Sequence, residues 1–215
     1  REAGDWLERL VPPSARERLA MAFDSGRGRV VLFGGFRGTY LDDTWEWDGT
    51  SWTRRFPVAA PPARQGHAMA YDPTRGRVVL FGGYRGTYLD DTWEWDGTTW
   101  TQLSPVASPA ARATHAMAYD PGRGRVLLFG GDDQNPMDDT WEWDGATWTQ
   151  LLPVTSPPAR GGHAMVHDPG QGRMVLFGGA DGAPLGDTWA WDGTNWVQLF
   201  PVATPPASGF HAMAY

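Results

Sequence analysis

The sequence predicts an all-β protein made from four copies of a four-stranded unit. Three observations support this prediction: a repeat of 48 residues, short apolar runs that end in paired glycines, and prolines too closely spaced for long helices. The repeat is clearest in the tripeptide Asp-Thr-Trp, whose tryptophans are Trp45, Trp93, Trp141 and Trp189. A constant period of about 20–50 residues is typical of arrays in which each copy is one supersecondary unit.

Two further motifs recur with the same 48-residue period. Leu-Phe-Gly-Gly recurs with its first glycine at Gly34, Gly82, Gly130 and Gly178, and His-Ala-Met recurs at His67, His115, His163 and His211. The stretch Arg29–Thr53 matches Arg77–Thr101 at 23 of 25 positions, which indicates recent internal duplication. We assign residues 1–215 to one repeat domain, with repeats at about 19–66, 67–114, 115–162 and 163–210 and partial repeats at 1–18 and 211–215.

The second repeat illustrates the four strands, which we letter a to d in chain order. They are expected at His67–Tyr71, Arg77–Phe81, Asp91–Trp95 and Trp100–Leu103. The a strand alternates small and large residues, and the b strand is a β-branched and aromatic run. The two tryptophans of the c strand, at i and i+2, lie on one face. Asp96-Gly97 supplies the hairpin turn between c and d, and a proline-rich linker leads to the next a strand.

These residues resemble kelch repeats. The resemblance rests on Gly82-Gly83 after an apolar strand, Trp93 and Trp95 in the c strand, Trp100 at the start of the d strand, and Arg64-x-x-His67 before the a strand. It implies a β-propeller, in which each repeat is a four-stranded antiparallel blade packed face to face around a central channel. One departure is Trp-x-Trp in the c strand, where kelch repeats more often have a tyrosine. We interpret it as a packing variant.

The two ends of the chain carry pieces of further repeats. Trp6–Leu10 matches a d strand and His211–Tyr215 matches an a strand, beside four complete repeats. Three interpretations follow: an arc of a longer propeller, an assembly of several copies, or an irregular ring of four or five blades. We expect the first, because Arg1 is neither an initiator methionine nor the start of a signal peptide.

Composition excludes several function classes. The net charge of −7 gives no basic field for nucleic acid, and no apolar run approaches the ~18 residues that span a bilayer. The absence of cysteine excludes disulfides, iron–sulfur clusters and cysteine nucleophiles. All 18 basic residues are arginine, and isoleucine is absent, which is typical of GC-rich bacterial genes. Together with the resemblance, this favours an extracellular or cell-surface location.

Candidate binding residues lie in the loops between strands b and c. The turns of the opposite face are nearly uniform, whereas these loops differ between copies, and functional residues concentrate on loops held by a rigid frame. Tyrosine and arginine are enriched at interfaces, and aromatic rings stack on sugars. The candidates are Phe36, Arg37, Tyr40, Tyr84, Arg85, Tyr88, Asp132, Asp133, Gln134, Asn135 and Asp181. The alternative is that the tyrosines pack over the blades and the arginines are only solvated.

No metal site or cofactor is expected. The repeated histidines belong to different blades and suit a scaffold role better than a shared ion. Paired acids occur at Asp42-Asp43, Asp90-Asp91 and Asp138-Asp139. Because the second acid precedes Thr-Trp in every copy, with Asp187 in the fourth, we expect it to accept backbone N–H bonds in Asx-type turns. A weak cation site is the alternative.

The function expected is that of a non-catalytic scaffold that recognises a protein or a glycan through the b–c and d–a loop face. No catalytic motif is present, and the absence of cysteine excludes the cysteine–tyrosine chemistry of kelch-type copper oxidases. One alternative is a kelch-type enzyme that acts on a sugar at the channel mouth. Another is a structural module that self-associates through incomplete blade edges. Nucleic-acid binding and membrane insertion are not expected.

Overall fold

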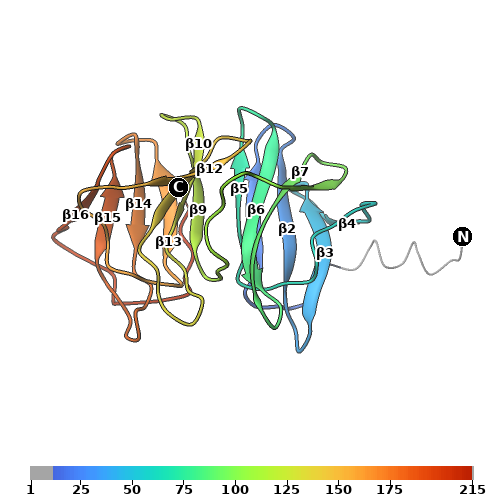
Figure 1. The fold of residues 1–215 in the computed structure, drawn as a ribbon. Helices are drawn as coiled ribbons and strands as arrows, with labels where there is room; N and C mark the ends of the chain where they lie inside the picture. Colours follow the sequence, from blue (N-terminus) through green and yellow to red (C-terminus); the bar gives the residue numbers. More distant parts are fainter. Residues whose placement is uncertain (1–11, 215) are drawn as a thin grey trace, which may run out of the picture. The chain divides into compact units, whose positions relative to one another are not determined.

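The computed structural model describes residues 12–214, and all helices and strands assigned in that range are β-strands (Figure 1). They form four antiparallel sheets of four strands, each sheet in chain order. The first two sheets are β1 (Ala20–Asp24), β2 (Arg29–Phe36), β3 (Tyr40–Trp47) and β4 (Trp52–Arg55), then β5 (Ala68–Asp72), β6 (Arg77–Tyr84), β7 (Tyr88–Trp95) and β8 (Trp100–Leu103). The all-β fold of four-stranded blades is confirmed.

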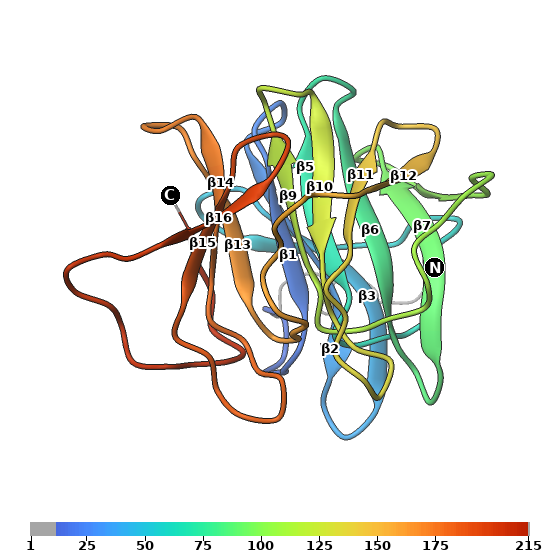
Figure 2. The same ribbon diagram turned by 60° about the vertical axis from the view of Figure 1, so that its left-hand side comes forward.

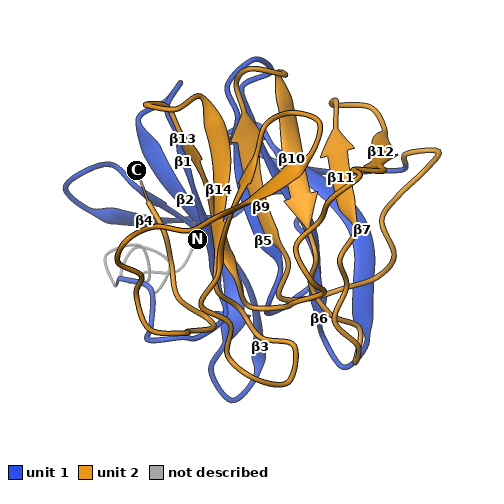
Figure 3. Ribbon diagram, turned by 90° about the vertical axis from the view of Figure 1, so that its left-hand side faces the viewer, with its two compact units in different colours: residues 1–104 blue, residues 105–215 orange. Residues whose placement is uncertain are grey.

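The other two sheets repeat this order. They are β9 (Ala116–Asp120), β10 (Arg125–Phe129), β11 (Thr140–Trp143) and β12 (Trp148–Leu151), then β13 (Ala164–Asp168), β14 (Arg173–Phe177), β15 (Thr188–Trp191) and β16 (Trp196–Leu199). The chain divides into two compact units, Arg1–Ser104 and Pro105–Tyr215, which Figure 3 colours separately. Each unit holds two sheets whose a strands lie side by side, β1 with β5 and β9 with β13 (Figure 2).

The b and c strands of unit 1 are longer than expected. β6 continues through both glycines to Tyr84, which pairs with Tyr88, and a bulge lies between Phe81 and Gly83. In unit 2 the b strands end earlier and the c strands begin later, and Asp132 and Pro136 form only an isolated bridge. Proline has no backbone N–H and therefore cannot extend the ladder.

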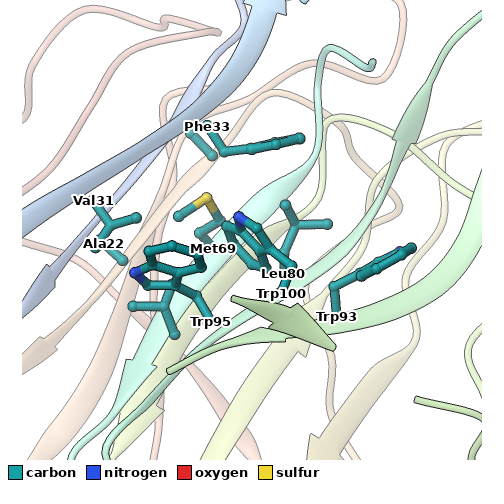
Figure 4. Close-up of a cluster of buried hydrophobic side chains, with 10 residues drawn as sticks. Ala22, Val31, Phe33, Met69, Leu80, Trp93, Trp95 and Trp100 are labelled. Atoms are coloured by element: carbon teal, nitrogen blue, oxygen red, sulfur yellow. The ribbon is translucent and has the colours of Figure 1, made fainter. Parts of the chain in front are cut away.

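The core of unit 1 lies between its two sheets. Figure 4 shows Val31 and Phe33 of the first sheet beside Met69, Trp95 and Trp100 of the second. The Phe33 and Trp100 rings meet edge to face, with centroids 5.4 Å apart. Unit 2 repeats the arrangement with Phe129 and Trp196, at 5.1 Å.

Three indole N–H groups in these cores have acceptors on the preceding sheet, whereas the buried Nε1–H of Trp191 has none among the described residues. Trp100 Nε1 donates to Thr44 Oγ1 at 2.9 Å, and Trp196 Nε1 donates to Thr140 Oγ1 at 3.0 Å. Trp95 Nε1 donates to the buried Glu46 carboxylate at 3.1 Å. Trp95, Trp100 and Trp196 therefore both fill the space between blades and connect each sheet to the one before it, since a buried indole N–H usually has a hydrogen-bond partner.

The paired glycines allow a close approach between backbones. Gly34 has φ +60°, and a Cβ there would lie 2.8 Å from the carbonyl oxygen of Arg64 in the linker to the second sheet. Gly35 has φ +104° and donates its N–H to the same carbonyl at 2.9 Å. The motif thus joins the first, third and fourth sheets to the linkers that follow them, since Gly131 and Gly179 make the same bond to Arg160 and Ser208.

The two partial repeats give different outcomes. The expected strand Trp6–Leu10 lies outside the described residues. The expected strand His211–Tyr215 is not formed over residues 211–214. Within residues 12–214 the structure contains no helix long and apolar enough to cross a membrane.

Candidate binding surface

A buried ion pair in each blade anchors the b–c loops. The guanidinium of Arg64 donates to both carboxylate oxygens of Asp91, at 2.6 and 2.7 Å, and to the carbonyl of Gly82 at 2.8 Å. Asp91 also accepts the Nε1–H of Trp93 at 2.7 Å. The other blades contain the same pair, formed by Arg16 with Asp43, Arg112 with Asp139, and Arg160 with Asp187.

This network corrects the role expected for the second acid of each pair. Asp91 was expected to cap an Asx-type turn, but its carboxylate is used by the arginine and tryptophan side chains. Burial alone raises the pKa of Asp91, and the hydrogen bonds and charge of Arg64 lower it below its usual value. The Asx-type turns are formed by other aspartates, such as Asp96, which accepts the backbone N–H groups of Thr98 and Thr99.

Three of the four repeated histidines, His67, His115 and His163, are buried, and each follows one of these arginines by three residues. Burial first, and then the positive charge of Arg64, lower the pKa of His67 to about 3. Burial and Arg160 do the same for His163. The His67 ring packs edge to face on Phe33 at 5.5 Å. The rings of His67 and His163 are therefore neutral packing groups at physiological pH. Over residues 12–214, no group of three or more histidine or acidic side chains is arranged to hold a metal ion.

The b–c loops of unit 1 bring four predicted aromatic residues into one row. The ring centroids of Phe36 and Tyr40 are 5.4 Å apart, those of Tyr40 and Tyr84 are 6.1 Å apart, and those of Tyr84 and Tyr88 are 5.0 Å apart. The Tyr40–Tyr84 contact joins the two blades. All four residues are partly exposed. We call these four residues the aromatic row.

Two arginines stand at the tips of the same loops. Arg37 and Arg85 are exposed, and within the described residues neither guanidinium forms an ion pair or a side-chain hydrogen bond. Their backbones close the loops, since Arg37 donates its N–H to the Thr39 carbonyl at 3.0 Å. The exposed carboxylate of Asp42 belongs to the adjoining strand. The guanidinium groups are available to a ligand.

The b–c loops of unit 2 surround a polar hollow of about 350 Å³. Three of the predicted residues, Asp132, Gln134 and Asp181, line it together. The other two predicted residues, Asp133 and Asn135, do not, and the backbone N–H of Asn135 donates to the Asp133 carboxylate at 3.4 Å. We call this feature the acidic hollow.

Sequence reasoning missed two residues beside the acidic hollow. Phe210 lines it, and Thr114 Oγ1 donates to the carboxylate of Asp132. Both residues directly precede a repeated histidine and have positive φ, 60° and 58°, at a position where two other copies have Gly66 and Gly162. A bulky residue rarely adopts this conformation. The sequence therefore contained a signal for these two residues: at the position before the repeated histidine, some copies have glycine and others have a larger residue.

Comparison with known proteins gives one family. The model of the KLHDC2/KLHL20/DRC7 Kelch-repeats domain matches residues 8–153, about two thirds of the chain. No curated protein matches the chain.

Proposed function

The chain belongs to the kelch-repeat family, and on that premise we propose that it is a non-catalytic scaffold that binds a protein partner through its b–c and d–a loop face. Kelch repeats generally mediate protein binding, and kelch-repeat domains are typically non-catalytic scaffolds. The face itself is our inference from the residues and contacts described above.

The observation that carries the proposal is the aromatic row with its two unpaired arginines. Ring-to-ring contacts already hold the tyrosines, so binding costs little side-chain entropy, and tyrosine and arginine are the residue types enriched at interface hot spots. The guanidinium groups of Arg37 and Arg85 have no acidic partner among the described residues. We infer that the partner presents carboxylates beside an aromatic or aliphatic side chain, because two such guanidinium groups favour acidic ligands.

A glycan is the second candidate, and the acidic hollow supports it. Asp132, Gln134 and Asp181 provide hydrogen-bond acceptors and an amide donor, and the partly exposed ring of Phe210 provides an apolar surface. Sugar hydroxyls and sugar ring faces match these two kinds of surface. The enzymatic alternative, with a sugar as substrate, would act at the same hollow.

The experiment is selection from a random peptide display library, with a glycan array in parallel. The wild-type chain should enrich acidic peptides whose binding weakens with salt, because screening reduces exposed charge interactions. The double variant Arg37→Ala/Arg85→Ala should lose at least about tenfold in affinity, which corresponds to about 1.4 kcal/mol. The charge reversal Arg37→Glu/Arg85→Glu should enrich basic peptides instead.

The matched control is Thr50→Ala/Thr98→Ala, which changes two exposed side chains in the c–d turns. It should bind the selected peptides like the wild type. Equal binding by the arginine variants would contradict the proposal. Binding to glycans that is lost on Asp132→Asn/Asp181→Asn and unchanged in the arginine variants would favour the acidic hollow instead.

A further inference from the structure

Gln65, in the linker before the second blade, is paired with the centre of the aromatic row. The Gln65 N–H donates to the Tyr84 carbonyl at 3.0 Å, and the Tyr84 N–H donates to the Gln65 carbonyl at 2.8 Å. Two residues that exchange both backbone bonds in antiparallel chains direct their side chains to the same side. The Gln65 side chain therefore points to the same side as the Tyr84 ring, which contacts both Tyr40 and Tyr88.

The equivalent position in unit 2 borders the acidic hollow. Gly161 follows Gln65 by two repeat steps and exchanges the same two backbone bonds with Ala180, at 3.0 and 2.9 Å. Gly161 lines the acidic hollow. The residue directly after the buried arginine of a blade therefore contributes to the loop face, although the residues predicted from the sequence all lie in the b–c loops.

The side-chain oxygen of Gln65, Oε1, is buried and has no hydrogen-bond partner among the described residues. Nearly all buried polar atoms in proteins have a partner, because an unpaired buried acceptor costs free energy. The residue as a whole is partly exposed, and no bond to Oε1 fixes the carboxamide. The last side-chain torsion of glutamine is broad, so the carboxamide can turn its oxygen toward a bound ligand.

We propose that Gln65 is a further binding residue of the aromatic row, and that its side-chain carbonyl accepts a hydrogen bond from a main-chain N–H of the protein partner. The inference rests on the proposed function, because it adds a contact to the same site. Arg37 and Arg85 bind the carboxylates of the partner, and Gln65 binds its main chain beside Tyr84. A carboxamide suits this role because, like a peptide group, it carries an N–H donor beside a carbonyl acceptor.

The other repeats have different side chains at this position. They are Glu17, Ala113 and Gly161. Alanine and glycine have no polar side chain to offer, and a glutamate turns a negative charge toward an acidic partner. Gln65 is therefore the neutral acceptor among these four positions, so it helps to determine where the main chain of the partner lies on the loop face of unit 1.

The experiment uses the acidic peptide that binds the wild-type chain most tightly in the library selection described above. Each main-chain N–H of this peptide is replaced in turn by an ester oxygen, which removes one donor and keeps every side chain. One of the ester peptides should bind the wild-type chain about fivefold more weakly, as expected for the loss of one hydrogen bond. The variant Gln65→Met has a side chain of similar length without the carbonyl. It should bind the parent peptide about fivefold more weakly, and it should not distinguish that ester from the parent.

The stability of the free chain separates this binding role from a structural one. Gln65→Met should leave the urea midpoint of the free chain unchanged or higher, because the carbonyl that it removes has no partner within residues 12–214. The matched control is Gln102→Met, which changes an exposed glutamine of β8. This control should alter neither the midpoint nor the affinity for the peptide.

Three results would overturn the inference. The first is a urea midpoint lowered by Gln65→Met, which would show that the fold itself uses the carbonyl. The second is a set of ester peptides whose relative affinities are the same for Gln65→Met and the wild type. If the variants of Arg37 and Arg85 still lose the peptide in that case, the proposed function stands without Gln65. The third is a library that enriches no acidic peptide, which would overturn the proposed function as well.

Discussion

Arg64 and Asp91 form a two-pronged ion pair that fastens the linker before one blade to the c strand of the same blade. The two N–O distances are 2.6 and 2.7 Å, and the Arg64 side chain is fully buried. The remaining guanidinium N–H groups reach the carbonyls of Pro62 and Gly82, at 3.0 and 2.8 Å. One side chain thereby connects the linker, the paired glycines and the base of the b–c loop.

Replacing Arg64 with methionine should destabilise the fold by about 3–5 kcal/mol, because Asp91 loses its partner in a largely buried site. Urea unfolding followed by tryptophan fluorescence measures the change. The matched control is Arg85→Met, which removes an exposed and unpaired guanidinium and should alter the free energy of unfolding by less than about 0.5 kcal/mol. Equal effects of the two variants would contradict the anchoring role.

Substitutions at Gly34 and Gly38 distinguish the cost of a positive φ from the cost of a steric clash. Both have positive φ, +60° and +73°, but a Cβ at Gly34 would lie 2.8 Å from the Arg64 carbonyl, whereas nothing lies within 4 Å of one at Gly38. Gly38→Ala should therefore cost about 1–2 kcal/mol, and Gly34→Ala clearly more. Thermal unfolding of the two variants measures the difference in stability. Equal losses of stability would show that the close approach of the Arg64 carbonyl adds nothing to the cost at Gly34.

Stability should fall as the pH drops from about 6.5 toward 3, because His67 and His163 bind protons in the unfolded chain but not in the fold. Their folded pKa values are lowered to about 3, so their contribution is fully present above pH 6.5. Each should contribute up to about 1.4 kcal/mol per pH unit within this window. The free energy of unfolding, measured by urea titration at several pH values, tests this.

The control for this pH dependence is His67→Leu, which should reduce the slope between pH 6 and 4.5 by the contribution of one histidine, about 1.4 kcal/mol per pH unit. Asp91 and its equivalents have lowered pKa values in the fold. Their contribution to stability is therefore lost only at lower pH, when the pH falls below about 4, the pKa of an aspartate in the unfolded chain. An unchanged slope in the variant would show that His67 is not kept neutral by the fold.

The fourth repeat suggests a double-mutant cycle on the face of the a–b and c–d turns, opposite the b–c loops. Arg123 and Glu142 form an ion pair in the third sheet, and the fourth repeat replaces both residues together, with Gln171 and Ala190. Arg123→Gln alone leaves the buried Glu142 without its partner and should destabilise the fold, whereas adding Glu142→Ala should recover part of the loss. We expect a coupling energy of about 1 kcal/mol, since Arg123 is partly exposed. Additive effects in urea unfolding would exclude the coupling.

Strand positions followed closely from local sequence patterns. The expected strand Trp100–Leu103 has the observed bounds, and Arg77–Phe81 begins at the observed residue. Alternation and turn residues act between neighbours along the chain, so they can be recognised without the fold. The extension of β6 to Tyr84 was missed, because it depends on a bulge after Phe81 that the apolar pattern does not indicate.

The sequence by itself determined the repeat, the four-stranded sheets and the kelch family, because a constant 48-residue step imposes the same local structure on every copy. Only the tertiary structure decided which side chains meet: Asp91 with Arg64, Tyr40 with Tyr84, and Phe210 with the acidic hollow. These contacts join residues from different blades or linkers. Their distances are set by how the sheets pack, which no local pattern encodes.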